Sequence, residues 1–449
     1  MARITSLNAH EAPPDAVRLR YKQYSKATPS EVEADTSIVD LQSLSPDNLS
    51  SGMVLVRSIS VEDLQPAFGE FIRTSAAHDP PQQSIPVYTH QSVTGLLMVP
   101  SLFPPAVQKE LLTRLFHRDL SNSAHKTNLH LHYDMKYPVQ ANGVTEYRDV
   151  TASLDESSNQ RVMSLFEDSQ TRTFPPKDPE VHKPLTMQAV LNKKLRWVTL
   201  GGQYDWTAKV YPAERPPAFP EDIAKLLRAA FPETEPEAAI LNLYSPGNTL
   251  SPHRDVSEEC DAGLISVSFG CDGLFLISHD DGQGCEIIRL RSGDAVYMDG
   301  TSRFAWHAVP KIVPGTCPSW LADWPCIPGG EHESRYESWK GWMAAGVFGE
   351  IRIIEANLEA FNEKVGQSKL PGAKQRLSKQ RDTGAHSVRH FSERNSCFEG
   401  KKCSGTTEEI EPRLSRASNA PGVADAIQKL PLIRDDEGCS YVEHAKAVP

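Results

Sequence analysis

The chain has 449 residues, 34 prolines, a hydrophobic content of 39% and a formal net charge of −11. That length allows one large domain or two to three ordinary ones with a sizeable core, and the prolines indicate a folded centre with irregular flanks. The negative charge argues against a protein that coats nucleic acid, so contact with nucleic acid would need a local basic patch.

The sequence also disfavours several other classes of protein. No stretch approaches the ~20 consecutive apolar residues that a transmembrane helix needs. The first residues, MARITSLNAHEAPPD, contain no apolar signal core, which predicts an intracellular protein of the nucleus, the cytoplasm or the mitochondrion. The eight cysteines form no CxxC pair, so neither a zinc ribbon nor a disulfide framework is indicated.

The first half of the chain predicts helices around a few strands. Residues 1–90 mix charges, Ser and Pro with short apolar clusters, and we expect a weakly ordered N-terminal extension with one helix near residues 61–77. In residues 91–238, a strand over Val93–Val99 precedes a helix that starts at a proline. A second helix near residues 220–232 repeats the apolar stripe at helical spacing.

The texture changes at residue 239. Short apolar runs closed by Gly, Asp and Pro follow one another up to about residue 360, which is typical of an antiparallel barrel or jelly roll. Residues 361–449 are rich in charge, Ser and Gly, and we expect a polar tail without a packed core. The predicted fold is therefore a mainly β core with flanking α-helices, α+β overall.

A histidine and an aspartate stand two residues apart in the segment NLYSPGNTLSPHRD. Residues two apart in a strand point to the same face, so His253 and Asp255 can present an imidazole and a carboxylate to one ion. His307, in SRFAWHAVP, is the candidate third ligand from another strand. Two histidines and one carboxylate leave positions open on the metal, the arrangement that suits oxygen-activating ferrous iron.

The surrounding segments resemble a known family. NLYSPGNTLSPHRD, then ISVSFG, then LRSGDAVYMDGTSRFAWHAVP resemble, in order and spacing, the AlkB family of iron- and 2-oxoglutarate-dependent dioxygenases over about residues 90–345. Upstream, LRWVTLGGQYDW resembles the nucleotide-recognition segment of its eukaryotic nucleic-acid demethylase branch. The resemblance implies a double-stranded β-helix, a jelly roll with iron near one mouth.

The resemblance also implies a role for particular residues. By position, the catalytic iron ligands would be His253, Asp255 and His307, the residues that bind 2-oxoglutarate would be Asn242 and Tyr244, and those that stack on or line the pocket for the target base would be Trp197 and Tyr204. Without the resemblance, we would favour a core tyrosine for Tyr244 and a turn-facing residue for Asn242, and Trp197 would more often be a core aromatic residue. His130 and His132 have no evident third ligand, and we expect them to be structural. His279 stands beside DDGQG, and we expect it to be a solvated turn residue.

The closing strand departs from the family pattern. The family carries two arginines about six residues apart, and the first binds the distal carboxylate of 2-oxoglutarate as a planar bidentate cation. Here Arg352 is present but Leu358 stands six residues later, because an exon boundary is misassigned or because the member is degenerate. Arg352 is the predicted cosubstrate anchor, and Arg303 is the alternative because even spacing would put it on the strand face of His307.

The implied activity is oxidative removal of N-methyl groups from nucleic-acid bases in RNA or DNA. Its cofactor would be Fe(II) with 2-oxoglutarate and dioxygen as cosubstrates, and its products formaldehyde, succinate and carbon dioxide. Two alternatives remain open at this point: a hydroxylase of protein side chains on the same iron site, and an inactive jelly roll that binds nucleic acid or a partner because its closing strand is degenerate.

Overall fold

The structure is a computed structural model that describes residues 7–8, 11–73, 84–148, 160–205, 215–256, 261–327 and 333–354. The polar tail expected over residues 361–449 and Leu358 lie outside these ranges. Among the residues described, no helix is long and apolar enough to cross a membrane.

The described residues form both α-helices and β-strands. The helices are α1 (Asp15–Lys26), α2 (Pro29–Ala34), α3 (Val61–Ile72), α4 (Pro105–Thr113), α5 (Met187–Ala189), α6 (Glu221–Ala230) and α7 (Glu333–Tyr336). The strands are β1 (Val39–Asp40), β2 (Met53–Ser60), β3 (Ser84–His90), β4 (Val93–Val99), β5 (Tyr137–Ala141), β6 (Val144–Arg148), β7 (Gln160–Val162), β8 (Thr173–Phe174), β9 (Leu185–Thr186), β10 (Trp197–Gly201), β11 (Ala238–Tyr244), β12 (Leu250–His253), β13 (Leu264–Gly270), β14 (Asp272–Ser278), β15 (Cys285–Leu290), β16 (Ala295–Met298), β17 (His307–Val313) and β18 (Phe348–Ile354).

Two sheets form the core. One has five strands in the order β1-β15-β14-β17-β12, and the other has eight in the order β10-β11-β18-β13-β16-β4-β3-β2. From β11 onward the chain passes back and forth between them, with β11, β13, β16 and β18 in the larger sheet and β12, β14, β15 and β17 in the smaller. This alternation is the double-stranded β-helix, and it confirms the predicted jelly-roll core with flanking helices.

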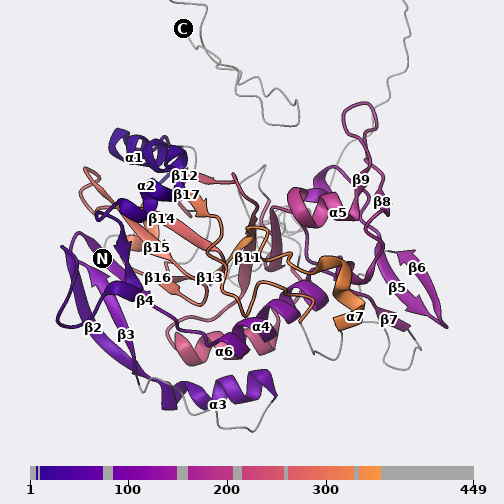
Figure 1. The fold of residues 1–449 in the computed structure, drawn as a ribbon, viewed down its shortest axis with the longest axis horizontal. Coiled ribbons are helices and arrows are strands. Elements are labelled where there is room, and N and C mark those ends of the chain that lie inside the picture. The colour runs from indigo at the N-terminus through magenta and orange to yellow at the C-terminus, as the bar shows by residue number, and fades with distance from the viewer. Residues whose placement is uncertain are drawn as a thin grey trace, which may run out of the picture. The chain divides into compact units, whose positions relative to one another are not determined.

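Helices cover the outer faces of both sheets (Figure 1). Helices α1 and α2 lie over the five-stranded sheet, and α3, α4 and α6 lie over the eight-stranded sheet. Ile265, Val267 and Phe269 of β13 are fully buried under the second group. Burial of each such side chain stabilises the fold by about 1.5–3 kcal/mol.

The alternate residues of the same strands face the space between the sheets. At one end this space is apolar, with Phe275 and Ile288 of the smaller sheet packed against Leu96 and Met298 of the larger. At the other end β11, β13 and β18 present polar side chains, among them Asn242 and Ser266, both buried. The pleat therefore supplies an apolar core on one side of each strand and a polar interior on the other.

The expectation of a weakly ordered extension over residues 1–90 is wrong for the part that the structure describes. Strands β2 and β3 extend the eight-stranded sheet through β4, and β1 pairs in parallel with β15. Tyr24 of α1 is 1% exposed. Strand β2 lies at the sheet edge with several exposed positions, so its sequence lacks a clear apolar alternation. The divisions at residues 91–238 and 239–360 stay predictions.

Candidate metal centre

The structure brings His253, Asp255 and His307 together. Strand β12 ends at His253 and β17 begins at His307, and the two residues are paired across the ladder. The His253 Nε2 atom lies 3.6 Å from the Asp255 carboxylate and the His307 Nε2 atom lies 3.4 Å from it. One ligand atom from each residue lies within 4.8 Å of the others, so the three side chains can share one ion.

The hydrogen bonds at Nδ1 of the two imidazoles make Nε2 the nitrogen of each ring that faces a cation. His253 Nδ1 lies 2.9 Å from the Ser251 carbonyl oxygen, and His307 Nδ1 lies 3.0 Å from the Ala305 carbonyl oxygen. A carbonyl oxygen only accepts, so each Nδ1 carries the proton and each Nε2 keeps its lone pair. Outer hydrogen bonds of this kind fix the tautomer and ring orientation of metal-binding histidines.

Protonation also suits metal binding. Burial, together with the charges of His307 and Arg352, lowers the pKa of His253 to about 3, so this imidazole is neutral at physiological pH. Burial alone would raise the pKa of Asp255, but the hydrogen bond and charge of His307, with His253 and Arg352, lower it well below its ordinary value. A neutral imidazole and an ionised carboxylate are the forms that bind metal ions.

The strand argument for the pair was only half right. His253 is the last residue of β12, whereas Asp255 lies two residues further on, outside regular secondary structure. Arg303 holds this segment: its Nη1 donates to the main-chain oxygen of Asp255 at 2.8 Å and its Nε donates to that of Ala262 at 3.1 Å.

Arg303 was predicted from even spacing to lie on the strand face of His307. That prediction is wrong, because Arg303 lies in a 3₁₀ turn over Ser302–Phe304 that precedes β17. It is 1% exposed, and its Nε and Nη1 atoms donate to main-chain oxygens. Arg303 therefore positions Asp255, and its role as an alternative cosubstrate anchor has no support from this geometry.

Arg352 of β18 points into the three ligands. Its Nη1 atom lies 2.5 Å from His307 Nε2, 3.2 Å from His253 Nε2 and 3.3 Å from the Asp255 carboxylate. Burial would lower its pKa, but the charges of Glu350 and Asp255 raise it, so the guanidinium is a permanent cation. A metal ion at this position would have to displace Nη1, because two cations cannot share one set of ligands.

The other end of Arg352 is suited to an anion. Its Nη2 atom is buried and has no hydrogen-bond partner within the described part of the chain. An unsatisfied buried donor is costly, and a carboxylate is the partner that a guanidinium binds most strongly. This observation supports Arg352 as the cosubstrate anchor.

A second charged residue, Glu350, was missed by the sequence reasoning. It lies two residues before Arg352 on the same strand face, is 1% exposed, and pairs with Asn242 of β11. Its carboxylate accepts hydrogen bonds from the Ser266 hydroxyl at 2.6 Å and the Tyr244 hydroxyl at 3.4 Å, and lies 3.1 Å from Arg352 Nε. The signal was present, since Glu350 and Arg352 are two charged residues in a strand whose other members are apolar or glycine.

Glu350 alters the expected cosubstrate pocket. Asn242 and Tyr244 share one face of β11, as predicted, and both are buried. The Tyr244 hydroxyl, however, already donates to a carboxylate of the protein itself. Burial and the charge of Glu350 raise the pKa of Tyr244 well above its ordinary value. The side chains of His253, Asp255 and His307 thus fit a ferrous ion. Arg352 fits a carboxylate of a dicarboxylate cosubstrate, whereas the negative charge of Glu350 does not.

The two aromatic candidates for a base pocket are separated. Trp197 begins β10 and pairs with Asn242, so its side chain lies on the same sheet face as the cosubstrate residues. Tyr204 lies beyond the opposite end of β10, where Gly201 pairs with Ala238. It packs against the apolar cluster between the sheets. Only Trp197 is brought beside Asn242.

The fold and the ligand set define a class of oxygenase, and comparisons with known proteins agree. Residues 143–337 match the model of the 2OG-Fe(II) oxygenase superfamily. The N6-methyladenosine RNA demethylase ALKB1 of Pyricularia oryzae is 44% identical, covering 76% of this chain and 95% of its own. ALKBH of Cryphonectria parasitica, also named an N6-methyladenosine RNA demethylase, is 50% identical over 48% of this chain and 93% of its own length.

A third relative is the tRNA demethylase abh1 of Schizosaccharomyces pombe, which is 34% identical over 58% of this chain and 78% of its own length. The chain belongs to the AlkB family of 2OG-Fe(II) oxygenases. The resemblance inferred from the sequence is therefore confirmed.

Proposed function

We propose that this chain is an Fe(II)- and 2-oxoglutarate-dependent dioxygenase that removes N-methyl groups from bases in nucleic acid. The observation that carries the proposal is the convergence of two Nε2 lone pairs and one ionised carboxylate, each fixed by the main chain around it. The relatives named as RNA and tRNA demethylases support a nucleic-acid substrate.

The residues of the site would have two separate roles. His253, Asp255 and His307 would hold the iron, and Arg352 would bind a cosubstrate carboxylate through Nη2 once Nη1 leaves the ligands. Bound iron and 2-oxoglutarate supply the oxidation of the methyl group by dioxygen. His307 and Arg352 are buried between the two sheets, whereas the side chains of His253 and Asp255 are 31% and 23% exposed, so the ion position is reached from the surface at these two residues.

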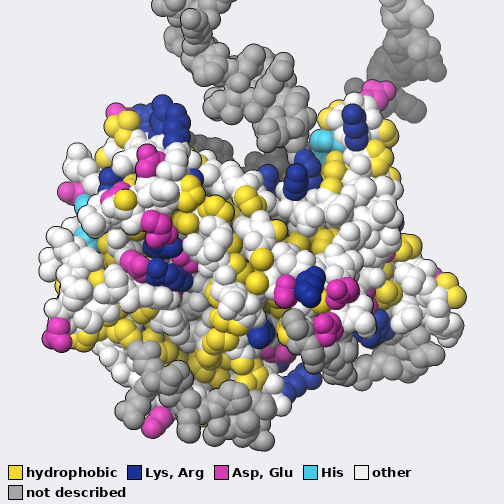
Figure 2. Space-filling view, in the orientation of Figure 1, with side chains coloured by type: hydrophobic (Ala, Val, Ile, Leu, Met, Phe, Trp, Pro, Cys, Tyr) yellow, Lys and Arg dark blue, Asp and Glu magenta, His cyan; other side chains and the backbone are white. Residues whose placement is uncertain are grey.

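The surface favours a local contact with nucleic acid. On the face in Figure 2, Lys and Arg side chains occur in small groups among acidic ones rather than as one broad basic surface. A short basic group, Lys193 and Arg196, is exposed directly before Trp197. Such a group could touch a phosphate while Trp197 stacks on a base turned out of its helix, since every base has a flat face. A flipped base or a structured RNA fits this better than an extended duplex.

The test is turnover of methylated oligonucleotides. Purified chain would be supplied with Fe(II), 2-oxoglutarate and dioxygen, and with RNA or DNA strands carrying N-methylated or unmethylated bases. We expect formaldehyde and succinate in equal amounts with the methylated strands, and none with His253→Ala. Succinate without loss of methyl would instead favour a protein hydroxylase. Binding of nucleic acid without succinate would favour an inactive binding protein.

A further inference from the structure

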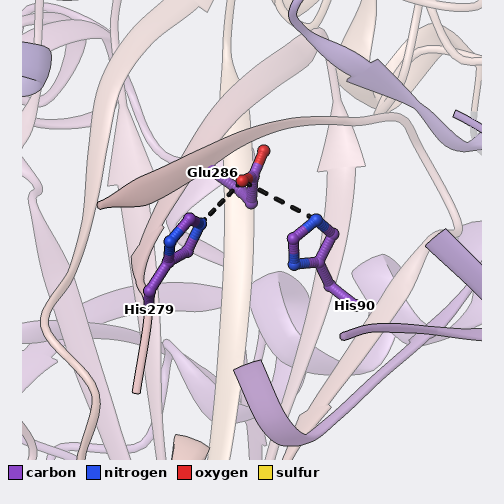
Figure 3. A group of neighbouring side chains, drawn as sticks. All are labelled: His90, His279 and Glu286. Atoms are coloured by element: carbon purple, nitrogen blue, oxygen red, sulfur yellow. Dashed lines mark hydrogen bonds and ion pairs between the residues drawn. The ribbon is translucent and has the colours of Figure 1, made fainter. Parts of the chain in front are cut away.

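A second group of metal-binding side chains lies outside the centre described above. His90, His279 and Glu286 place one ligand atom each within 4.8 Å of the others (Figure 3). His90 is the last residue of β3, His279 follows β14, and Glu286 belongs to β15. The group therefore connects the eight-stranded sheet to the five-stranded sheet. The prediction that His279 is a solvated turn residue is wrong, since its side chain is 22% exposed and bonded to Glu286.

Both imidazoles converge on the same carboxylate oxygen. His279 Nε2 lies 2.7 Å from Glu286 Oε1, and His90 Nε2 lies 3.7 Å from that atom. The two rings are stacked, with centroids 5.7 Å apart and planes at 20°. In a tetrahedral site with bonds near 2.05 Å, ligand atoms are about 3.3 Å apart. The two distances to Glu286 lie on either side of that value, and the two histidine nitrogens lie within 4.8 Å of each other.

The backbone is shaped to admit both rings. A Cβ atom on Gly52, whose φ is +79°, would lie 2.2 Å from His90 Nε2. A Cβ atom on Gly284 would lie 2.5 Å from His279 Nδ1. Glycine has no Cβ atom and leaves this space for the imidazole rings. Any other residue at Gly52 or Gly284 would displace the neighbouring histidine ring.

A neighbouring residue fixes the approach of the two histidine segments. The Asp280 carboxylate accepts the Thr94 N–H at 3.0 Å, and the Asp280 N–H donates to the Ser92 carbonyl oxygen at 2.9 Å. The turn after β3 and the turn after β14 are thus joined before any ion binds. A site whose ligands are already in place loses less conformational freedom on binding.

We propose that His90, His279 and Glu286 form a second divalent-cation site, of the zinc type, that links the two sheets. Two imidazole nitrogens favour Zn²⁺ and its transition-metal neighbours over Mg²⁺ and Ca²⁺, which prefer oxygen. Three protein ligands leave a fourth position for water or another ligand.

Binding requires two hydrogen bonds to change. The Glu286 carboxylate only accepts, so in the neutral His279 ring the proton of the 2.7 Å bond is on Nε2. The Ser92 N–H donates to His90 Nδ1 at 3.3 Å, so in the neutral His90 ring the proton is on Nε2 as well. Coordination through both Nε2 atoms moves each proton to the Nδ1 atom of its own ring, and the His90 ring must then move away from the Ser92 N–H. Neither proton is released, and the two new metal–nitrogen bonds offset the two lost hydrogen bonds.

The experiment is a Co²⁺ titration of the full chain, freed of metal with a chelator and kept anaerobic. Bound equivalents would be counted by equilibrium dialysis and visible absorption. We expect one bound equivalent of Co²⁺ to remain in His253→Ala. In Glu286→Gln and His279→Ala, the affinity for this equivalent should fall by more than the roughly 10–100-fold that changes to residues around the ligands cost. Glu286→Gln keeps the size of the side chain and can still accept from His279, so it serves where His279→Ala unfolds.

Asp281→Asn is the matched control, because Asp281 is an exposed carboxylate in the turn between His279 and Glu286 and is not among the three ligands. It should retain the equivalent. In chains that carry His253→Ala, Zn²⁺ should displace Co²⁺ and raise the Tm when Glu286 is present but not when Glu286→Gln is added. Equal Co²⁺ binding by Glu286→Gln and native chain would overturn the proposal, as would an equivalent that only His253→Ala removes. The outcome is separate from that for the first centre, which is read from His253→Ala alone.

Discussion

Replacing Glu350 with Gln should tighten the binding of 2-oxoglutarate. The Glu350 carboxylate is buried and accepts the Tyr244 hydroxyl, which the family resemblance assigns to the cosubstrate. A cosubstrate carboxylate at Tyr244 would therefore lie close to a second negative charge. Glutamine keeps the shape and the acceptor oxygen for Ser266 but removes that charge.

The size of the effect follows from the distances. Two carboxylates that share one hydroxyl lie about 5 Å apart, and at an effective dielectric constant of about 20 they repel by roughly 3 kcal/mol. Arg352 Nε lies 3.1 Å from Glu350 and offsets part of this charge. If about half of the repulsion remains, its removal strengthens binding by roughly 1.5 kcal/mol, or about tenfold.

The assay is calorimetric titration of 2-oxoglutarate into the native chain and Glu350→Gln, without oxygen and with Mn²⁺ in place of Fe²⁺. Glu62→Gln removes a charge from the exposed first turn of α3 and should leave the affinity unchanged. Denaturant unfolding would establish that both variants are folded. An equal or lower affinity in Glu350→Gln would refute the view that this carboxylate opposes the cosubstrate.

Three further outcomes are expected. His253→Ala and Asp255→Ala should each abolish succinate production while the far-ultraviolet circular dichroism stays native, because the apolar core rests on other residues; near-normal turnover would contradict the assigned ligands. Removal of residues 366–449, which lack an apolar period, should leave the Tm unchanged, and a large drop would show that the tail packs on the fold. Burial raises the pKa of Asp294 from 3.8 to about 7, so the folded state holds this proton more tightly and the free energy of unfolding should fall as pH rises across that interval. Asp294→Asn should remove this part of the slope in denaturant titrations, and an unchanged slope would exclude Asp294 as its source.

The sequence predicted the convergence of His253, Asp255 and His307 better than it predicted their surroundings. The two-residue spacing of His253 and Asp255 placed their side chains close together. The order of segments in the family resemblance then pointed to His307 as the third member. Glu350 escaped prediction because the resemblance places an arginine in this strand and directs attention to Arg352. Strand order decides which side chains meet, and residues 106 apart, such as Tyr244 and Glu350, give no local signal of their contact.

The N-terminal strands escaped prediction for a related reason. Strand propensity depends on the neighbours of a strand more than on its own residues. Among the described strands, β2 pairs with β3 alone, at the sheet edge, so half of its side chains need not be apolar. The helices were easier, because α6 carries its apolar stripe within ten residues.

Strand β18 sets the order in which the protein can be completed during synthesis. It is the last described strand, yet it lies between β11 and β13 in the interior of the larger sheet. Until the ribosome has released residue 354, both neighbours expose unpaired edges, which are templates for pairing with other chains. The pairing of β18 with β11 forms contacts between residues more than 100 positions apart in the sequence. Contacts over such separations slow folding. A nascent chain of this protein should therefore depend on chaperones that cover sheet edges until Glu350 and Arg352 arrive.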